Sequence, residues 1–303
     1  MTFSTLHPRP GVGILFNPSL EGFINQSSKS LDYLAVIPDR AWIDHGVGSH
    51  HRFERLPLPA AHLEAVAREL PIVLHSIGLS IGTAGDFDEE YVQNLIEWAE
   101  RFNSPWISEH LSFSRLGHGH EVNAGVALPI PYDQEVLDLL VPRVRTITRA
   151  LHCPFLLENS VYYFNYPDQT YSEEDFLNEL VRLSGCEVLL DLHNLYTNAT
   201  NHHFDALEYL NALDLNNVRE IHVAGGVPMM GFHTDSHTGP VLEAVWQLLE
   251  KTVPRTPNLR GVTFEFHEAS YRLLGEDGVH KQIERARSIL SSHVPSSFST
   301  SAG

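Results

Sequence analysis

The sequence predicts an α/β fold, a single closed (β/α)8 barrel, on three observations. Short apolar runs alternate eight times with longer segments of helical spacing, which is typical of parallel strands joined by crossover helices. The apolar runs are rich in valine, isoleucine and leucine, as expected for strands covered on both faces. The length of 303 residues suits one barrel of roughly 250 residues with added loops.

The expected elements follow one another in a regular order. The strands are residues 12–16, 33–37, 72–75, 106–110, 155–158, 188–191, 220–223 and 262–266. The helices are residues 60–70, 88–102, 134–151, 173–183, 205–213, 241–251 and 279–291. The first connection is the weakest, because only residues 20–25 can form a turn or two of helix. Ser172, ahead of three acidic residues, has the features of a helix N-cap.

Two long connections interrupt this rhythm, residues 38–59 and 112–132. Loops longer than about 12 to 15 residues are usually functional or disordered, and both follow strand ends on the face where barrels carry their active sites. We interpret residues 1–294 as one barrel domain. Residues 295–303 consist mostly of small residues, and we expect a disordered tail there.

Composition excludes several classes of function. Lys and Arg number 20 against 38 Asp and Glu, a formal charge of -18, so a nucleic-acid partner is disfavoured. The first residues resemble no signal peptide, and no apolar stretch approaches the ~18 residues that span a bilayer, so we expect a cytoplasmic protein without a membrane partner. Cys153 and Cys186 are far apart and predict neither a disulfide nor a thiolate zinc site.

Side chains of metal-ligand type stand at the carboxyl ends of six consecutive expected strands, which a barrel gathers at one mouth. They are His75, Glu109, His110, Glu158, Asn159, Asp191, His193, Asn194, His222, Glu265 and His267, and a following loop adds Asp235 and His237. Several carboxylates in one cavity lose hydration and repel one another, and bound cations remove that cost. We therefore expect a metal site at the carboxyl-terminal mouth of the barrel.

The donor types narrow the choice of metal. Imidazole with carboxylate and amide oxygens, without thiolate, suits Fe, Mn, Zn or Co. So many candidates favour two or three ions that share bridging carboxylates. Because successive strand side chains point to opposite faces, Glu109 and His110 are not both expected to be ligands, and spacing alone leaves the choice between them open.

The remaining histidines and one glycine-rich segment have simpler interpretations. Seven histidines fall in expected loops and are expected to be solvated: His50, His51, His118, His120, His202, His203 and His233. Of these, His50 or His233 can reach the mouth. The glycines of residues 77–82 match neither the P-loop nor the dinucleotide fingerprint, so we expect a tight turn there.

Several of these motifs, taken in order, resemble a known family. They are His75-Ser76-Ile77-Gly78-Leu79-Ser80-Ile81-Gly82, Ser108-Glu109-His110-Leu111, Leu128-Pro129-Ile130-Pro131-Tyr132, Leu157-Glu158-Asn159, Asp191-Leu192-His193-Asn194-Leu195-Tyr196, His222-Val223-Ala224-Gly225-Gly226 and Asp235-Ser236-His237. Over about residues 11–293 the chain resembles the DUF692 family. These are the multinuclear non-haem iron-dependent oxidative enzymes (MNIO), TIM barrels of the xylose-isomerase-like kind.

The resemblance implies two or three irons, in Fe2+ and Fe3+ states, that act with dioxygen to oxidise cysteine-containing precursor peptides. A small partner protein often delivers the peptide. The implied ligands are His75, His110, Glu158, Asp191 or Asn194, His222, Asp235, His237 and Glu265. The resemblance thus favours His110 over Glu109, which becomes a residue that orients a ligand. Asn159, His193 and His267 are further ligands or supports.

The chain departs from the family pattern at the second strand and beside Asp191. Ala35 stands where the family usually has a glutamate, so any role of that acid is lost or passes to Asp39. His193-Asn194 stands where the family commonly has two asparagines. These changes affect the expected number of metals and the substrate more than the existence of a metal site.

Three hypotheses of function remain at this point. The first is an iron- and dioxygen-dependent oxidase of a peptide thiol. The second is a Mn- or Zn-dependent isomerase or hydrolase of the same barrel group. Its endonuclease form is disfavoured by the negative charge, and its isomerase form by the absence of a lysine at any expected strand end. The third is a metal-binding scaffold without enzymatic activity.

Overall fold

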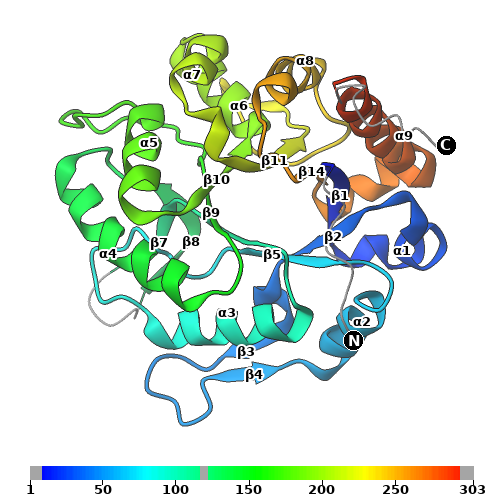
Figure 1. The fold of residues 1–303 in the computed structure, drawn as a ribbon, viewed down its shortest axis with the longest axis horizontal. Helices are drawn as coiled ribbons and strands as arrows, with labels where there is room; N and C mark the ends of the chain where they lie inside the picture. The colour runs from blue at the N-terminus through cyan, green and yellow to red at the C-terminus, as the bar shows by residue number, and fades with distance from the viewer. Residues whose placement is uncertain (1–8, 117–121, 294–303) are drawn as a thin grey trace, which may run out of the picture.

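Eight parallel strands form a closed barrel in the computed structural model, which describes residues 9–116 and 122–293 (Figure 1). The barrel strands are β1 (Gly11–Leu15), β2 (Tyr33–Val36), β5 (Ile72–Ser76), β6 (Ile107–His110), β9 (Phe155–Glu158), β10 (Glu187–Asp191), β11 (Val218–Ala224) and β14 (Gly261–Glu265). β1 pairs with both β2 and β14, which closes the sheet. The expected barrel is confirmed, and every expected strand is present with ends shifted by at most two residues.

Helices surround the barrel on its outer face (Figure 1). They are α1 (Glu21–Ser27), α2 (Pro57–Val66), α3 (Glu89–Phe102), α4 (Gln134–Ala150), α5 (Glu173–Ser184), α6 (Leu192–His202), α7 (Ala206–Ala212), α8 (Glu243–Thr252) and α9 (Tyr271–Ser292). Ser172 caps α5 as expected, since its side chain accepts a hydrogen bond from the backbone of Asp175. Among the described residues, no helix is long and apolar enough to cross a membrane.

Two helices differ from the expectation. Helix α6 is not among the expected helices, because the pattern around Asp191 indicates only the end of a strand. It begins directly after β10, and the Asp191 carboxylate caps it by accepting the backbone N–H of Asn194 at 2.7 Å. Helix α9 begins well before the expected residue 279. The non-helical Gly275 (φ 61°, ψ 177°) joins two helical pieces there. The helical spacing of apolar residues is interrupted at this glycine, so the sequence predicts only the second piece.

The two long connections form hairpins instead of irregular loops. Residues 38–59 contain β3 (Trp42–Asp44) and β4 (Phe53–Arg55), and residues 112–132 contain β7 (Ser112–Leu116) and β8 (Val122–Pro129). His50, in the turn of the first hairpin, is exposed, its ring centroid lies 4.5 Å from that of His51, and it is not a member of the donor groups at the mouth. His118, His120 and the expected tail 295–303 lie outside the described residues.

The barrel interior is layered, because alternate residues of each strand point inward. Tyr33, Trp106, Glu220 and Thr263 form one inner layer, which we call the barrel floor. Tyr33 fits only because glycines face it: a Cβ on Gly13 or Gly261 would lie 2.3 Å from its side chain. Two residues further along the same strands stand residues of the mouth, among them His222 and Glu265.

Both cysteines pack at the apolar core between the barrel and the helices. Cys186 is buried within this core, and the half-buried Cys153 packs against it. Burial raises the pKa of the Cys186 thiol to about 12 and that of Cys153 to about 11. Both thiols therefore stay protonated at neutral pH.

Candidate metal centre

Three groups of histidine and carboxylate side chains meet at the mouth, each with ligand atoms within 4.8 Å of one another. The groups are His75, His110 and Glu158; Glu158, Asp191 and His222; and His193, Asp235 and His237. They come from β5, β6, β9, β10 and β11, from α6, and from the loop that follows β11. Closure of the barrel thus brings together residues far apart in sequence.

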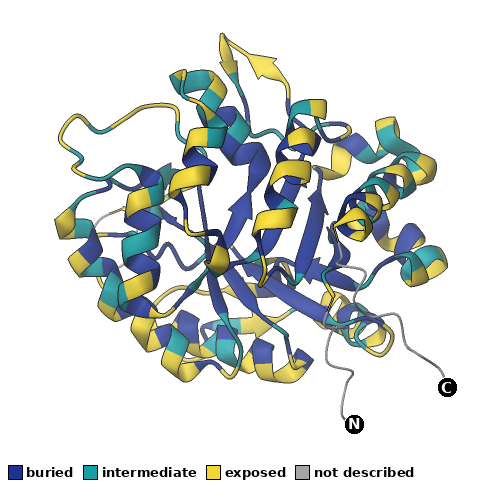
Figure 2. Ribbon diagram, turned by 45° about the horizontal axis from the view of Figure 1, so that its top comes forward, coloured by how far each residue is buried: buried dark blue, intermediate teal, exposed yellow. Residues whose placement is uncertain are grey.

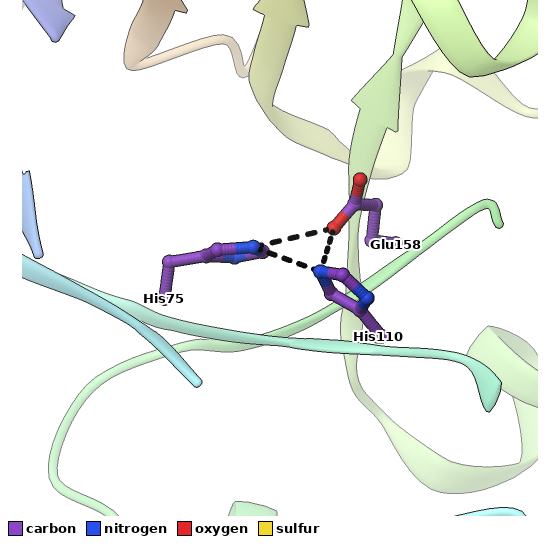
Figure 3. A group of neighbouring side chains, drawn as sticks. All are labelled: His75, His110 and Glu158. Atoms are coloured by element: carbon purple, nitrogen blue, oxygen red, sulfur yellow. Dashed lines mark hydrogen bonds and ion pairs between the residues drawn. The ribbon is translucent and has the colours of Figure 1, made fainter. Parts of the chain in front are cut away.

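The first group is a compact triangle of two imidazoles and one carboxylate (Figure 3). The Nε2 atoms of His75 and His110 are 3.0 Å apart, and they lie 3.6 Å and 3.2 Å from Oε2 of Glu158. Ser108 engages Nδ1 of His75 at 2.9 Å, which leaves Nε2 directed into the site. Burial and the neighbouring His110 lower the pKa of His75, so its imidazole is neutral and able to ligate a metal.

The second group shares Glu158 with the first. Asp191 uses one carboxylate oxygen to cap α6, and its other oxygen has no hydrogen-bond partner. Asn194 donates to Glu158 at 3.1 Å, and its own carbonyl oxygen is likewise unpaired. Burial raises the pKa of Asp191 to about 6 and that of Glu158 well above its usual range. These carboxyls therefore lack the counter-charge that ionisation in a buried site requires.

Glu265 connects the second group to the third. One of its oxygens contacts Nδ1 of His222, and the other lies 3.7 Å from Nδ1 of His237. Burial opposes ionisation of Glu265, but these two imidazoles outweigh it and lower the carboxyl pKa. Glu158 and Glu265 therefore stand at the two junctions of a continuous row of three groups.

The third group lies between α6 and the loop after β11. Asp235 Oδ1 is 2.8 Å from His237 Nε2 and 3.3 Å from His193 Nδ1. Burial disfavours a charged His237, but Asp235 and Glu265 outweigh it and raise the imidazole pKa to about 10. His233 stands beside this group, with its ring centroid 6.1 Å from that of His193. Of the two loop histidines considered, His233 thus reaches the mouth.

Unsatisfied polar atoms concentrate at this site. Among the described residues, seventeen buried side-chain N or O atoms have no hydrogen-bond partner, and eleven of them belong to the three groups, Asn194, His233 and Glu265. Each such atom costs about 1–3 kcal/mol, and buried polar groups are normally paired. Buried ligand atoms that converge on one point, most of them without a hydrogen-bond partner, fit a bound cation. The nitrogen and oxygen donors suit Fe, Mn or Zn.

The barrel floor supports the site from below. Glu220 Oε1 lies 3.3 Å from Nε2 of His222, the ring nitrogen opposite the one that contacts Glu265. The Glu220 carboxylate also accepts from the Trp106 indole N–H at 2.6 Å and the Thr263 hydroxyl at 2.5 Å. Glu220 is not among the residues predicted from the sequence, although its position two residues before His222 places it on the same inward face.

Glu109 is buried on the other side of β6, away from the three groups. Its carboxylate accepts the backbone N–H groups of His110 at 2.9 Å and Leu79 at 3.2 Å. Burial, with the nearby Asp39, raises the pKa of Glu109 to about 8. Asp39 itself bonds the Tyr91 hydroxyl and the backbone N–H of Ile77, so it also lies outside the groups.

Asn159 and His267, also considered as ligands, are placed in other roles. Asn159 clamps β10: its amide donates to the carbonyl of Asp191 at 3.0 Å, and its carbonyl accepts the N–H of Asp191 at 2.7 Å. Both amide atoms thus bond to the backbone of Asp191, so Asn159 supports a candidate ligand. His267 is exposed, and its Nδ1 accepts the backbone N–H of Ala269 at 3.2 Å.

Comparison with known proteins decides the family. Residues 11–290 match the family described as "RiPP precursor modification enzyme MbnB/TglH/ChrH". The chain belongs to this family. RiPPs are ribosomally made peptides that are modified after translation, so this MbnB/TglH/ChrH enzyme acts on a precursor peptide. The family expected from the sequence motifs is confirmed.

Curated relatives of this MbnB/TglH/ChrH enzyme include several UPF0276 proteins. A UPF0276 protein of Caulobacter vibrioides (strain NA1000 / CB15N) is 30% identical over 252 residues, 83% of this chain and 85% of that protein. A UPF0276 protein of Vibrio vulnificus (strain CMCP6) is 32% identical over 257 residues, 84% of this chain and 83% of its own.

Solved structures show the same fold at low identity. Endonuclease IV from Thermus thermophilus has a TM-score of 0.59 at 17% identity, covering 93% of this chain and 100% of its own. The IOLI protein with a bound zinc atom has a TM-score of 0.58 at 12% identity, covering 93% and 99%. These neighbours confirm the TIM-barrel fold.

Proposed function

We propose that this enzyme is an iron- and dioxygen-dependent oxidase that modifies a cysteine of its precursor peptide. The observation that carries the proposal is the row of three donor groups joined by Glu158 and Glu265. Shared carboxylates at such junctions are typical of sites that hold several ions close together. A structural site for one ion would need about four ligands, fewer than this mouth offers.

We infer that the row holds two or three irons. The proposed ligands are His75, His110, Glu158, Asp191, Asn194, His222, Asp235, His237 and Glu265, together with His193. Bound iron would supply redox chemistry with dioxygen. The protein would contribute imidazoles and carboxylates that are deprotonated when metal binds, and a floor that keeps His222 in one orientation.

The peptide is expected to approach a strongly acidic protein. The formal charge of -18 would attract a basic leader segment or a small basic partner protein that delivers the peptide. Because the precursor is made on ribosomes, we place this reaction in the cytoplasm.

Anaerobic reconstitution with ferrous iron tests the proposal. The loaded enzyme is mixed with the precursor peptide encoded beside its gene and then exposed to air, while oxygen consumption and peptide mass are followed. We expect two or three irons per chain, oxygen uptake, and a mass change that a Cys→Ser peptide does not show. Absence of iron uptake, or of oxygen consumption with the peptide, would overturn the proposal, and zinc-loaded enzyme serves as the control.

A Mn- or Zn-dependent isomerase or hydrolase is the second candidate, because nitrogen and oxygen donors without sulfur suit these metals equally well. Against its isomerase form, the three lysines of the chain, Lys29, Lys251 and Lys281, all lie outside the barrel strands. Elemental analysis of the purified enzyme separates the two candidates. Stoichiometric Zn or Mn, with a product formed under anaerobic conditions, would favour this one.

A further inference from the structure

An exposed apolar surface stands at the edge of the candidate metal centre. It consists of Val227, Met229, Met230 and Phe232 in the loop after β11, with Tyr163 and Phe164 in the loop after β9. We call these six residues the rim patch. They are six of the thirteen large hydrophobic side chains that are exposed among the described residues. Exposed apolar side chains gathered in this way mark interaction sites, whereas scattered ones need no explanation.

The four loop residues after β11 form a projecting hairpin. β12 (Pro228–Met229) pairs with β13 (Phe232–His233), and both short strands are largely exposed, as Figure 2 shows. At its tip, Met230 has φ 52° and Gly231 has φ 88°. Glycine and asparagine adopt these dihedrals with less strain than methionine does. The tip of a hairpin is therefore an unfavourable place for Met230 as far as folding is concerned.

Two of the three methionines of the chain are adjacent at this tip. Met229 is 60% exposed and Met230 is 92% exposed, so neither contributes to the core. Methionine is a flexible, polarisable side chain that adapts to varied apolar partners. Folding does not account for the pair, whereas contact with a bound molecule does.

The base of the hairpin is fixed to the metal centre. The Thr234 hydroxyl donates to the carbonyl of Val227 at 2.7 Å. The Asn201 side chain accepts the backbone N–H of His233 at 2.8 Å and donates to its carbonyl at 2.9 Å. Asp235, a member of the third donor group, follows directly. A molecule that touches the tip is therefore held at a fixed place relative to the candidate ligands.

Tyr163 connects the two halves of the rim patch. Its ring meets that of Phe232 edge to face, with centroids 6.0 Å apart, and its hydroxyl accepts the backbone N–H of Asp235 at 3.2 Å. The patch is thus continuous from the exposed methionines to the backbone of a candidate ligand. A peptide chain that places one residue at the donor groups can therefore rest neighbouring residues on this rim.

We propose that the rim patch binds an apolar segment of the precursor peptide next to the residue that is modified. The proposal rests on the proposed function, in that it takes the peptide substrate to be the occupant. It assigns a specificity role to the patch: peptides with large apolar residues beside the target cysteine bind more tightly than peptides with polar residues there.

Fluorescence anisotropy tests the binding role of the rim patch with two labelled synthetic peptides. Both have a central cysteine, which is flanked by leucines in one peptide and by serines in the other. The wild-type protein is compared with a Met229→Ser/Met230→Ser variant. The control is Leu58→Ser/Leu273→Ser, which removes two other strongly exposed apolar side chains, at 84% and 80% exposure, outside the rim patch. We expect the wild type and the control to prefer the leucine peptide by about tenfold, and the methionine variant to lose that preference.

Equal affinity of the wild type for both peptides, absence of binding included, would overturn the proposal, as would an unchanged preference in the methionine variant. Light scattering is run in parallel, because a dimer that becomes monomeric in the methionine variant would assign the patch to a second copy of the chain instead. Binding needs no metal, so it is measured on metal-free and iron-loaded protein. If the protein prefers the leucine peptide but does not oxidise the precursor peptide, only the proposed function is overturned. If it oxidises the precursor peptide but shows no preference for the leucine peptide, only the rim-patch assignment is overturned.

Discussion

The floor of the barrel and its mouth both bury polar side chains, but they satisfy them in different ways. On the floor, Glu220 is paired with Trp106 and Thr263, both of which donate to its carboxylate. At the mouth, Glu158, Asp191 and Glu265 each keep an oxygen with no hydrogen-bond partner. A buried acid with protein partners is part of the scaffold, whereas a row of buried donors without partners indicates a site for something the chain does not itself supply.

Substitution at a junction of the row should have the largest effect. Glu158→Gln removes the carboxylate shared by two donor groups, and a neutral amide is a far weaker ligand for a hard cation. We expect iron content, measured by elemental analysis, to fall by more than half, and peptide oxidation to disappear. The exposed Glu284→Gln on α9 is the matched control, and a variant that retains full iron would contradict the shared role of Glu158.

Metal loading should raise stability, because the unpaired donors gain partners only in the folded state. With free metal at 100 times its dissociation constant, the stabilisation is about 2.7 kcal/mol, or roughly 5 °C in Tm for a chain of this size. Differential scanning calorimetry before and after chelation measures the change. An equal shift in the Glu158→Gln variant would show that the metal acts elsewhere.

Loss of the floor acid should weaken metal binding without abolishing it. Glu220→Gln removes the negative partner of His222, and outer partners of ligating histidines typically contribute 10- to 100-fold in affinity. Competition with a chromophoric chelator measures the dissociation constant of the metal. Thr263→Val also breaks the floor network but leaves the carboxylate in place, so it should lower stability with little change in affinity. If both variants lose metal affinity equally, the effect is due to packing of the floor and not to the Glu220 carboxylate.

A substitution outside both regions should have the smallest effect. Gly185 ends α5 with φ 79°, a conformation that alanine adopts only with strain. Gly185→Ala should reduce the free energy of unfolding by about 1 kcal/mol in urea titrations. Iron content should not change, and a loss of iron here would mean that general destabilisation mimics loss of a ligand.

The sequence predicted the barrel and the location of the metal site because both follow from periodicity. Inward residues at the ends of parallel strands converge, so His75, Glu158 and His222 could be placed together without a structure. Because successive strand side chains point to opposite faces, only one of Glu109 and His110 was expected to be a ligand. The structure directs His110 into the row and Glu109 away from it.

Strand alternation does not account for the roles of two other residues, and both cases have a physical origin. His193 reaches its group from the first turn of an unexpected helix, where the strand rule of alternation does not apply. Asn159 has the chemistry of a ligand, but its hydrogen bonds to the Asp191 backbone use both amide atoms. Residue type indicates what a side chain can bind, whereas only the folded backbone determines which partner it meets.

The position of Glu265 on the final barrel strand has a consequence for biosynthesis. The ribosome makes β14 last among the barrel strands, and only its pairing with β1 and β11 carries Glu265 to the junction of two donor groups. The complete set of donors therefore exists only after the eighth strand has been synthesised and docked. Metal should therefore enter the finished barrel at its mouth, and under the proposed function a cell short of iron would accumulate folded, metal-free protein that can still be loaded later.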